Sequence, residues 1–470
     1  MTTTSSTSNQ LSTQPLPRKP GAHLLLGDLN AFTHDRLAYL QTIVDHYSPL
    51  VEVRFGPVRQ LISSSPEGMQ QVLQSNNRNY LKEQFFMNFT RLALTSGDNL
   101  FTSDGDYWLK QRRIMQPMFH RKQIAGFGDV INGETDHLWA SWEGAANSQQ
   151  PVELGEAMMH LTMQIIGRTM LNVDMQRAQA ALHEAYAFVS SHIVDRSANP
   201  LLPPLWVPTP VNRRFKQALA TIHNALTAII QRRQTSEETP HDLLAMLLAA
   251  RYEESGGKMS MAQLVDELFG IVSAGHETTS MALMWTFYLL AQHPHVEQKL
   301  HAEVDRVLGG RLPTVTDIDQ LTYTRMVLQE VLRLYPPAYI TARQAVDADQ
   351  LHGHTIPAGA KLILNLYGLQ RHAAYWPEPQ RFDPERFAPQ QEANIPKFAY
   401  LPFGAGPRKC IGEPLAMMEA QMILAAIVQR YRLRLLADRP VEPSAAFVLR
   451  AKAGVWMTLD KRETGKRVDR

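Results

Sequence analysis

A single thiol, Cys410, is present among the 470 residues of the chain. It lies in the segment 403–412, whose glycines and proline indicate a tight loop, and Arg408 stands two residues before it. Pro414 and the strongly apolar stretch 415–428 indicate that a helix starts directly after the loop. The free N–H groups and the dipole of such a helix start favour a thiolate. A lone thiolate in this setting suits an anionic metal ligand, and haem iron is the metal most often held by one cysteine.

A second group that could do chemistry lies in an apolar helix expected over residues 268–290, where Glu277 stands between His276 and Thr278. A buried carboxylate is costly unless it is paired, and it is often functional. Gly275 weakens the helix and Thr278 can bond back to a carbonyl, so this turn could open beside dioxygen and water. Neighbouring helical residues point about 100° apart, so Thr278 could face a cofactor while Glu277 reaches a water channel. A structural salt bridge of Glu277 is the open alternative.

Composition and charge exclude several classes of protein. One cysteine leaves no intramolecular disulfide and no paired-cysteine zinc or iron–sulfur site, although a small buried apolar side chain is the usual fate of a free cysteine. Lys plus Arg number 47 against 45 for Asp plus Glu, and a net charge of +2 argues against a nucleic-acid binder. The polar, Pro-containing start of the chain predicts a disordered tail without signal peptide or membrane anchor. Because Glu277 also makes its apolar helix a costly membrane span, we expect a soluble, cytoplasmic protein.

The elements that would position these groups are mostly helical. Helical periodicity dominates from about residue 109 to 308. Alternating apolar residues predict strands at 51–55 and between 340 and 371, with the alternation continuing through Leu366. We therefore expect a mainly α protein with a small β subdomain. The expected parts are a disordered tail over 1–20, one domain over 21–460 and a loose basic tail over 461–470.

The loop and the helix resemble elements of the cytochrome P450 family, the haem-thiolate monooxygenases. The family signature around the iron ligand has Phe, Gly, Arg, Cys and Gly at fixed spacing. Its oxygen-binding groove reads Ala or Gly, Gly, any residue, Asp or Glu, Thr, then Thr or Ser. The resemblance runs from about residue 17 to residue 459. The signature positions are Phe403, Gly406, Arg408, Cys410 and Gly412, and the groove positions are Ala274, Gly275, Glu277, Thr278 and Thr279.

The resemblance implies a single triangular-prism domain that binds haem b, iron protoporphyrin IX, between two core helices. It implies that Cys410 is the axial ligand of the iron and donates the electron density that favours O–O cleavage. Thr278 and Glu277 would deliver protons to dioxygen, and one oxygen atom would enter a C–H or C=C bond. Ala274 and Phe403 would lie against the haem.

A buried triad is implied by the same resemblance. Glu330 and Arg333 lie three apart, so they share one face of an expected helix. By spacing alone most such pairs are solvated and contribute little. In the family this pair is buried and joins a later arginine, which Arg386 matches in this chain. The triad is structural, and removing one member is expected to cost several kcal/mol because a buried charge is left unpaired.

The two haem propionates need cations, and the resemblance assigns four residues to them. Trp108 and Arg112 lie four apart and match the family's Trp-x-x-x-Arg element. Arg343 and Arg408 complete the set, and arginine suits it because its guanidinium binds carboxylates in a bidentate way. The aromatic and aliphatic side chains between residues 80 and 101 either roof the substrate pocket or belong to the core.

The expected partners follow from the reaction. Electrons would come from a separate protein, a ferredoxin or flavodoxin with its reductase. A basic surface formed by Lys110, Lys397, Arg408 and Lys409 would attract such an acidic carrier. The substrate is expected to be lipophilic, a fatty acid, a terpenoid or a polyketide-like molecule, with dioxygen as co-substrate.

Two other functions remain open at this point. A peroxygenase of the same fold would use hydrogen peroxide and would need no acid and alcohol to protonate dioxygen. A haem-binding sensor would not catalyse a reaction and would need no proton relay. The presence of both Glu277 and Thr278 favours the monooxygenase over either alternative.

Overall fold

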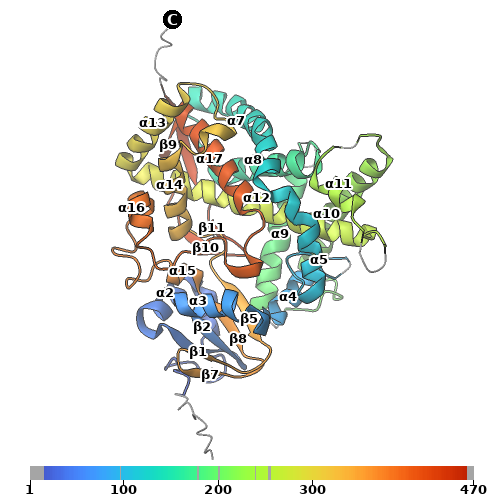
Figure 1. The fold of residues 1–470 in the computed structure, drawn as a ribbon, viewed down its shortest axis with the longest axis vertical. Helices are drawn as coiled ribbons and strands as arrows, with labels where there is room; N and C mark the ends of the chain where they lie inside the picture. The colour runs from blue at the N-terminus through green and yellow to red at the C-terminus, as the bar shows by residue number, and fades with distance from the viewer. Residues whose placement is uncertain are drawn as a thin grey trace, which may run out of the picture.

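The structure is a computed structural model that describes residues 15–95, 97–176, 179–199, 202–238, 240–251 and 256–462. Helices make up most of these residues, and a smaller β region lies at one end of the helical body (Figure 1). This arrangement confirms the predicted mainly α fold with a small β subdomain. No helix in the described ranges is both long enough and apolar enough to cross a lipid bilayer.

The helices and strands have the following bounds. The helices are α1 (Leu29–His34), α2 (Arg36–Tyr47), α3 (Pro66–Gln70), α4 (Gln84–Arg91), α5 (Gly105–Met115), α6 (Arg121–Ile124), α7 (Gly128–Ser148), α8 (Leu154–Leu171), α9 (Gln179–Ala198), α10 (Pro210–Thr235), α11 (Leu243–Ala249), α12 (Met261–Gln292), α13 (Pro294–Leu308), α14 (Thr322–Leu334), α15 (Leu366–Leu369), α16 (Pro389–Glu392) and α17 (Glu413–Arg430). The strands are β1 (Leu50–Phe55), β2 (Val58–Ser63), β3 (Tyr80–Lys82), β4 (Val152–Glu153), β5 (Thr341–Ala345), β6 (Asp349–Leu351), β7 (His354–Ile356), β8 (Lys361–Leu364), β9 (Tyr431–Leu435), β10 (Pro443–Ala445), β11 (Leu449–Ala451) and β12 (Trp456–Lys461). Three short helical turns also matter for the site: η1 (Gln71–Ser75), η6 (Pro384–Phe387) and η7 (Gly406–Arg408).

The main sheet combines strands from both ends of the chain, in the order β1-β2-β8-β5-β3. β2 pairs with β8 in parallel, and the other neighbours pair antiparallel. The register places Lys82 of β3 opposite Arg343 of β5. Two segments that are far apart in the sequence therefore bring two cationic residues to the same position of the sheet.

α12 is the long central helix, and its ends have clear local causes. Ser260 and Gln263 form a capping box, in which the Ser260 hydroxyl accepts from the Gln263 N–H at 3.2 Å and the Gln263 side chain accepts from the Ser260 N–H at 2.9 Å. The helix ends before Pro294, which starts α13. Most of its side chains are buried against α8, α10, α14 and α17. Burial of most of its circumference explains why the helix is apolar over most of its length.

Two details differ from the sequence expectations. The strand alternation stops at Leu364, because the Asn365 side chain accepts from the Gly368 N–H at 2.9 Å and caps α15, so Leu366 begins a helical turn. α12 is continuous from Met261 to Gln292, so the predicted opening at Gly275 is wrong. A Cβ atom at Gly275 would lie 2.5 Å from Ile166 Cδ1 of α8, and the glycine therefore permits close packing of the two helices.

The ends of the described chain are attached to sheets. Arg18 forms a parallel bridge with Glu52, and the Lys19 N–H donates to the Glu52 carbonyl at 3.1 Å, just ahead of residue 21. β12 pairs with β9 up to Lys461 at the other end. Residues 1–14 and 463–470, on which most of the two predicted tails fall, lie outside the described residues.

Candidate haem and proton-relay site

The loop before Cys410 is held by backbone contacts that require glycine. Gly406 has a φ of +67°, and a Cβ there would lie 1.8 Å from the carbonyl oxygen of Leu73 in η1. The loop therefore packs directly against the backbone of the β region. The Cys410 N–H donates to the Phe403 carbonyl at 2.9 Å, which closes the loop between the first residue of the predicted signature and the thiol. α17 begins three residues after the thiol, as the sequence predicts.

The thiol of Cys410 experiences opposing influences. Burial raises its pKa and is the largest effect, while hydrogen bonds from the Gly412 and Glu413 N–H groups and the charge of Arg112 act to lower it. The helix start therefore favours a thiolate, as predicted, but burial has the larger effect on the pKa of the Cys410 thiol. The residue nevertheless keeps accessible surface. The thiol is therefore surrounded by protein atoms but remains accessible.

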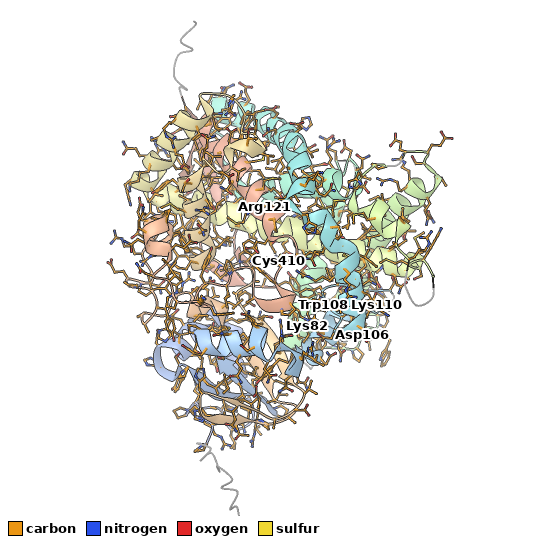
Figure 2. The ribbon with its side chains drawn as sticks, viewed as in Figure 1. Lys82, Asp106, Trp108, Lys110, Arg121 and Cys410 are labelled. Atoms are coloured by element: carbon orange, nitrogen blue, oxygen red, sulfur yellow. The ribbon has the colours of Figure 1, made fainter. Side chains whose placement is uncertain are left out.

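Two predicted cofactor residues of α5, Trp108 and Arg112, contact the segment that carries Arg408 and Cys410. The Arg112 guanidinium donates to the Lys409 carbonyl at 2.8 Å and so joins α5 to the Cys410 loop. The Arg408 guanidinium stacks 4.3 Å from the Trp108 ring centroid, and its Nη2 pairs with Asp104. Figure 2 shows Cys410 near the centre of the molecule and Trp108 on α5 beside it.

Cations accumulate next to this contact. Burial and, to a lesser extent, the positive charge of Arg408 together lower the pKa of Arg343 to about 10, while Asp104 acts in the opposite direction. Lys82 is affected in the same way: burial lowers its pKa well below the usual value, and Arg408 and Arg343 add to the effect. Asp104, which accepts from the Lys82 backbone N–H at 3.0 Å, is the carboxylate that offsets these charges. Three buried or half-buried cations share one carboxylate, which favours binding of a further anion.

These observations test whether the chain fits haem. Lys82, Arg343 and Arg408 are three positive charges near one carboxylate, Asp104. The two propionates of a porphyrin would supply two further negative charges. The accessible thiol of Cys410 can supply a single sulfur ligand. Among the described residues, no group of three or more His, Cys, Asp or Glu side chains could hold a metal ion directly. One accessible sulfur donor, with cations nearby for two carboxylates, fits haem.

The α12 turn separates two polar side chains. The Thr278 hydroxyl donates to the Ala274 carbonyl one turn earlier at 2.8 Å, as predicted. Ala274 is exposed and Thr278 half-exposed, although most neighbouring side chains of α12 are buried. Glu277 is buried and points in another direction, toward Arg450 of β11. The side-chain contacts of Glu277 and Thr278 lie within α12 or lead to α9 and β11, rather than to the Cys410 loop.

The environment of Glu277 raises its pKa. Burial is the largest cause, and the charge of Arg450 and a hydrogen bond with Ser190 act in the opposite direction. The Arg450 Nη2 and the Glu277 Oε1 atoms are 3.8 Å apart, which is a loose ion pair. Glu277 also lines a cavity of about 190 Å³, as the predicted water channel requires, and Thr278 is not among the residues that line it.

The predicted triad is assembled and buried. Arg333 donates to both carboxylate oxygens of Glu330 at 2.7 Å, and both side chains are 0% exposed. The Arg386 Nε lies 3.4 Å from Glu330 Oε1, and the Asp383 N–H donates to the same oxygen at 2.9 Å. The pair is therefore buried rather than solvated, which spacing alone could not decide.

Gln370 connects this triad to the Cys410 loop. Its carbonyl accepts from Arg333 at 2.9 Å, and its side-chain oxygen accepts from the Leu401 N–H at 2.8 Å. The Leu401 carbonyl in turn accepts from the Gly404 N–H at 3.0 Å. A continuous path of hydrogen bonds thus leads from the triad to the Cys410 loop.

Three residues of these clusters were missed by the sequence interpretation: Lys82, Asp104 and Arg450. Asp104 stands four residues before Trp108, directly ahead of α5, and an acidic residue at a helix start is a signal that could have been used. Lys82 and Arg450 are brought in by strands that are distant in sequence from their partners, and no local pattern marks them.

The predicted basic surface is partly different. Arg408 is half-buried and engaged with Asp104 and Trp108, so it is not an outward-facing cation. Lys409 remains exposed and pairs with Glu413 at 2.5 Å. Lys397 is exposed, and Lys110 is half-exposed on α5.

Comparison with known proteins gives concordant matches. Residues 17–456 match the family described as Cytochrome P450. The chain is 36% identical over 418 residues to the cyclooctat-9-en-7-ol 5-monooxygenase of Streptomyces melanosporofaciens, covering 88% of this chain and 89% of the relative. It is 30% identical over 428 residues to the pentalenene oxygenase of Streptomyces avermitilis, covering 91% and 93%.

Among solved structures, a match is found to the haem domain of cytochrome P450DA. The TM-score is 0.86 at 25% sequence identity, and the match covers 96% of this chain and 99% of the other. The fold and the sequence relatives thus point to one and the same family.

Proposed function

The chain belongs to the cytochrome P450 family and is a haem b monooxygenase, and from this premise we propose which residues carry the reaction and on what substrate it acts. The proposal is that Cys410 holds the haem iron and that Thr278 and Glu277 deliver protons. The observation that carries it is the Cys410 loop: one thiol beside the N–H groups of Gly412 and Glu413, next to cations that share a single carboxylate. When bound, haem supplies the activation of dioxygen, with the thiolate favouring O–O cleavage.

The protein's own contribution begins with binding. Arg112 positions the Cys410 loop through the Lys409 carbonyl, while Arg343 and Arg408 are placed to bind propionates together with Lys82. Trp108 keeps the Arg408 guanidinium in place by stacking. Phe403 at the start of the loop and Ala274 on α12 would help to hold the ring. These contacts fix the orientation of the cofactor before any substrate enters.

Proton delivery depends on the α12 turn. The Thr278 hydroxyl donates to the Ala274 carbonyl, so its oxygen can accept a hydrogen bond and orient a water molecule. The raised pKa of Glu277 allows its carboxyl to hold a proton closer to neutral pH than an ordinary glutamate does. Thr278 would therefore orient the proton next to the reacting oxygen, and Glu277 would resupply it.

The proposed substrate is a mostly hydrocarbon molecule of terpenoid type, such as an alkene or alkenol. Two relatives are named for oxidation of cyclooctat-9-en-7-ol and of pentalenene, an alkenol and an alkene. In this chain an aromatic group supports an apolar substrate: Phe447 lies 6.3 Å from Phe86 and 6.1 Å from Phe101 by ring centroids. The three rings come from α4, from the loop before α5 and from the loop between β10 and β11. Aromatic side chains of this kind favour ligands with little polar surface.

The proposed electron donor is a separate acidic protein, a ferredoxin or flavodoxin with its NAD(P)H-dependent reductase, which places the reaction in the cytoplasm where such donors are reduced. α5 carries basic side chains and contacts the Cys410 loop through Arg112, and α6 packs against α17. Figure 2 shows Lys110 and Arg121 on this part of the molecule. The basic residues of this surface are Lys110, Arg113, Arg121, Lys122 and Lys409.

Charge reversal tests the donor surface. Arg113→Glu with Arg121→Glu should lower the second-order rate of reduction by a ferredoxin about tenfold at low salt, and the difference should shrink as salt rises. Lys216→Glu on α10 removes an exposed positive charge elsewhere and should leave the rate unchanged. Equal rates for both proteins at low salt would refute this docking surface.

The reaction itself is tested with labelled oxygen. The purified holoenzyme, a ferredoxin, its reductase and NADPH are incubated under ¹⁸O₂ with terpene hydrocarbons and with fatty acids as the comparison set. We expect one ¹⁸O atom in a terpenoid product and the other in water. Label-free product formed from added hydrogen peroxide alone would instead indicate a peroxygenase, and a fatty-acid product would correct the substrate class.

A further inference from the structure

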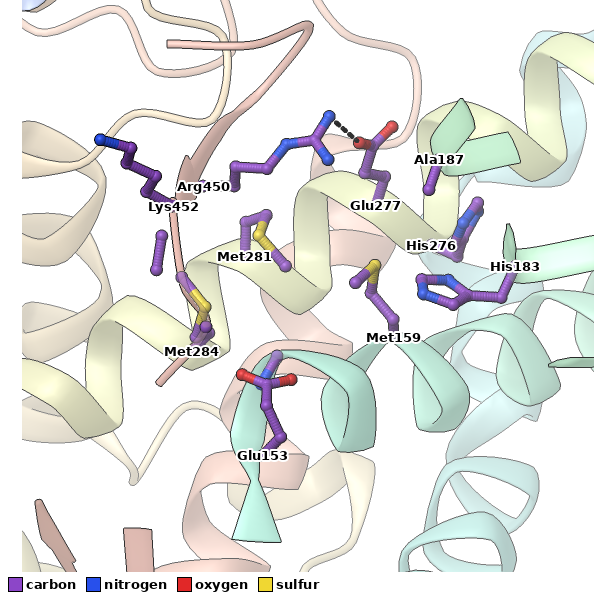
Figure 3. A pocket seen from close by; sticks show the side chains of 13 residues that line it. Glu153, Met159, His183, Ala187, His276, Glu277, Met281, Met284, Arg450 and Lys452 are labelled. Atoms are coloured by element: carbon purple, nitrogen blue, oxygen red, sulfur yellow. Dashed lines mark hydrogen bonds and ion pairs between the residues drawn. The ribbon is translucent and has the colours of Figure 1, made fainter. Parts of the chain in front are cut away.

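A cavity on one side of α12 connects Glu277 with side chains of three other elements. It has a volume of about 190 Å³ and lies between α8, α9, α12 and the segment that starts in β11. Figure 3 shows Glu277, Arg450, His183 and Lys452 around it, with the Arg450 side chain reaching toward the Glu277 carboxylate and Lys452 pointing away. The volume is large enough for several water molecules.

Arg450 is held in place toward Glu277 by α9. Its Nη2 atom donates to the Ser191 hydroxyl at 3.3 Å and lies 3.8 Å from Glu277 Oε1. The neighbouring Ser190 makes a hydrogen bond with Glu277. The Glu277 side chain is 8% exposed and that of Arg450 is 27% exposed, so the pair spans the distance from the buried helix toward solvent.

Two polar atoms at the cavity wall have no hydrogen-bond partner within the protein: Arg450 Nε and His183 Nδ1. Both are buried and belong to residues that line the same cavity. Water in the cavity would satisfy both, because a buried polar atom is costly when unpaired. These two atoms therefore indicate a hydrated rather than a dry cavity.

The way from this cavity to solvent is marked by a histidine pair. The His183 ring lies edge to face with the His160 ring of α8, with 5.7 Å between the centroids. His160 is exposed, His183 is half-buried and Glu277 is buried, which gives a graded path inward. His276 takes no part, because its Nδ1–H donates to the Val272 carbonyl at 2.6 Å and burial lowers its pKa to about 4.

We propose that this cavity is the proton entry to Glu277, with His183 at its mouth and Arg450 as the residue that positions the Glu277 carboxyl. The inference rests on the proposed relay role of Glu277. The loose 3.8 Å pairing allows the carboxyl to take up a proton from cavity water and then turn away from Arg450. A tight bidentate pair would hold the carboxylate in its charged form.

The overall reaction sets what the route must carry. One substrate molecule RH, one O₂, two electrons from NAD(P)H and two protons give ROH and one H₂O. When the substrate is not oxidised, the same two electrons and two protons convert O₂ to H₂O₂. A route that supplies protons too slowly therefore lowers the rate of NAD(P)H consumption. The amount of H₂O₂ formed gives the fraction of electrons that do not lead to oxidised substrate.

Turnover of the holoenzyme is the first test, with the compound that yields ¹⁸O-labelled product as substrate. Arg450→Gln should lower kcat about tenfold and raise the solvent deuterium isotope effect, while the substrate dissociation constant stays the same. Arg450→Lys should restore part of the rate because it returns a positive charge. Lys452→Gln is the matched control, since Lys452 lines the same cavity but pairs with Glu442 at 3.4 Å, and it should behave as wild type.

A second measurement needs no substrate and no electron donor. The infrared band of the protonated Glu277 carboxyl, assigned by its loss in Glu277→Gln, shifts when its proton exchanges in D₂O at mildly acidic pH. Ala187→Phe places a ring in the cavity and should slow this exchange about tenfold, and His183→Phe should slow it less. Lys452→Gln should exchange at the wild-type rate.

The two measurements separate the possible failures. Exchange that is unchanged in Ala187→Phe, or a kcat that falls equally in Arg450→Gln and Lys452→Gln, overturns the proposed route. Slowed exchange together with normal turnover of Glu277→Gln supports the route and refutes the relay role of Glu277. Slowed exchange together with slowed turnover supports both.

Discussion

Two buried glutamates of this protein each face an arginine, but the two pairs differ in distance and in access to water. Glu330 on α14 receives two hydrogen bonds of 2.7 Å from Arg333, and both side chains are 0% exposed. Glu277 on α12 lies 3.8 Å from Arg450, at the wall of a cavity. We call these the α14 pair and the α12 pair. The first is closed on all sides, and the second is open to water on one side.

The two Glu–Arg pairs differ in how completely their charges and N–H groups are paired. The remaining N–H groups of Arg333 donate to the carbonyls of Gln370, Pro379 and Arg381, so the charge of the α14 pair is fully compensated. In the α12 pair, burial raises the Glu277 pKa more than Arg450 lowers it, and the Arg450 Nε has no partner in the protein. The fully paired Glu330 carboxylate is fixed in place. The Glu277 carboxyl is incompletely paired and can therefore exchange a proton.

Breaking the α14 pair should have the largest effect, on stability. Arg333→Ala leaves the Glu330 carboxylate buried without its main partner, and we expect the free energy of unfolding to fall by about 3–5 kcal/mol in chemical denaturation. Arg381→Ala breaks a pair whose side chains are 59% and 70% exposed, and it should cost less than about 1 kcal/mol. If the unfolding free energy fell by similar amounts in both variants, the α14 pair would not be the stabilising buried pair that we infer.

Breaking the α12 turn should affect catalysis far more than stability. Glu277→Gln and Thr278→Ala should each lower the rate of product formation on the order of a hundredfold, because each removes a general acid–base group. The free energy of unfolding should change by about 1 kcal/mol or less. If Glu277→Gln lowered the unfolding free energy as much as Arg333→Ala and formed product at the wild-type rate, the α12 pair would be structural rather than catalytic.

The α12 pair should also give stability a measurable pH dependence. Burial holds the pKa of Glu277 above its ordinary value of 4.5 in the folded protein. Above that value the unfolded chain has lost a proton that the folded protein keeps, so stability falls as pH rises and the loss ends above the folded-state pKa. The contribution to the slope is at most about 1.4 kcal/mol per pH unit.

Glu277→Gln should remove this contribution, so its unfolding free energy should depend less on pH than that of wild type in the range just above 4.5. Glu378→Gln, at an exposed glutamate, serves as the control and should keep the wild-type slope. A wild-type slope in Glu277→Gln would show that the carboxyl titrates as an ordinary glutamate.

The parts of the site that are local in sequence were predictable. The Cys410 loop and the Glu277–Thr278 turn each lie within ten residues, so spacing alone identifies the pattern. The spacing of Glu330 and Arg333 indicated a contact, but their burial depends on α15 and the segment around Arg381, which no helix pattern reveals.

Contacts between distant segments were not predictable. Lys82 meets Arg343 through strand pairing, and Arg450 reaches Glu277 because β11 runs beside α12. The assignment of Arg408 to the donor surface overlooked Asp104, which draws it inward. In each case the missing information was the packing of strands and loops onto helices, and local periodicity does not contain it.

The most direct test of the whole account is the absorption spectrum of the reduced carbon monoxide complex, recorded for wild type and Cys410→Ser with equal haem content. If the Cys410 thiolate holds the iron, the wild-type complex shows the strongly red-shifted band of a thiolate-bound haem, and Cys410→Ser lacks it. A red-shifted band of wild-type position and intensity in Cys410→Ser would contradict the central claim.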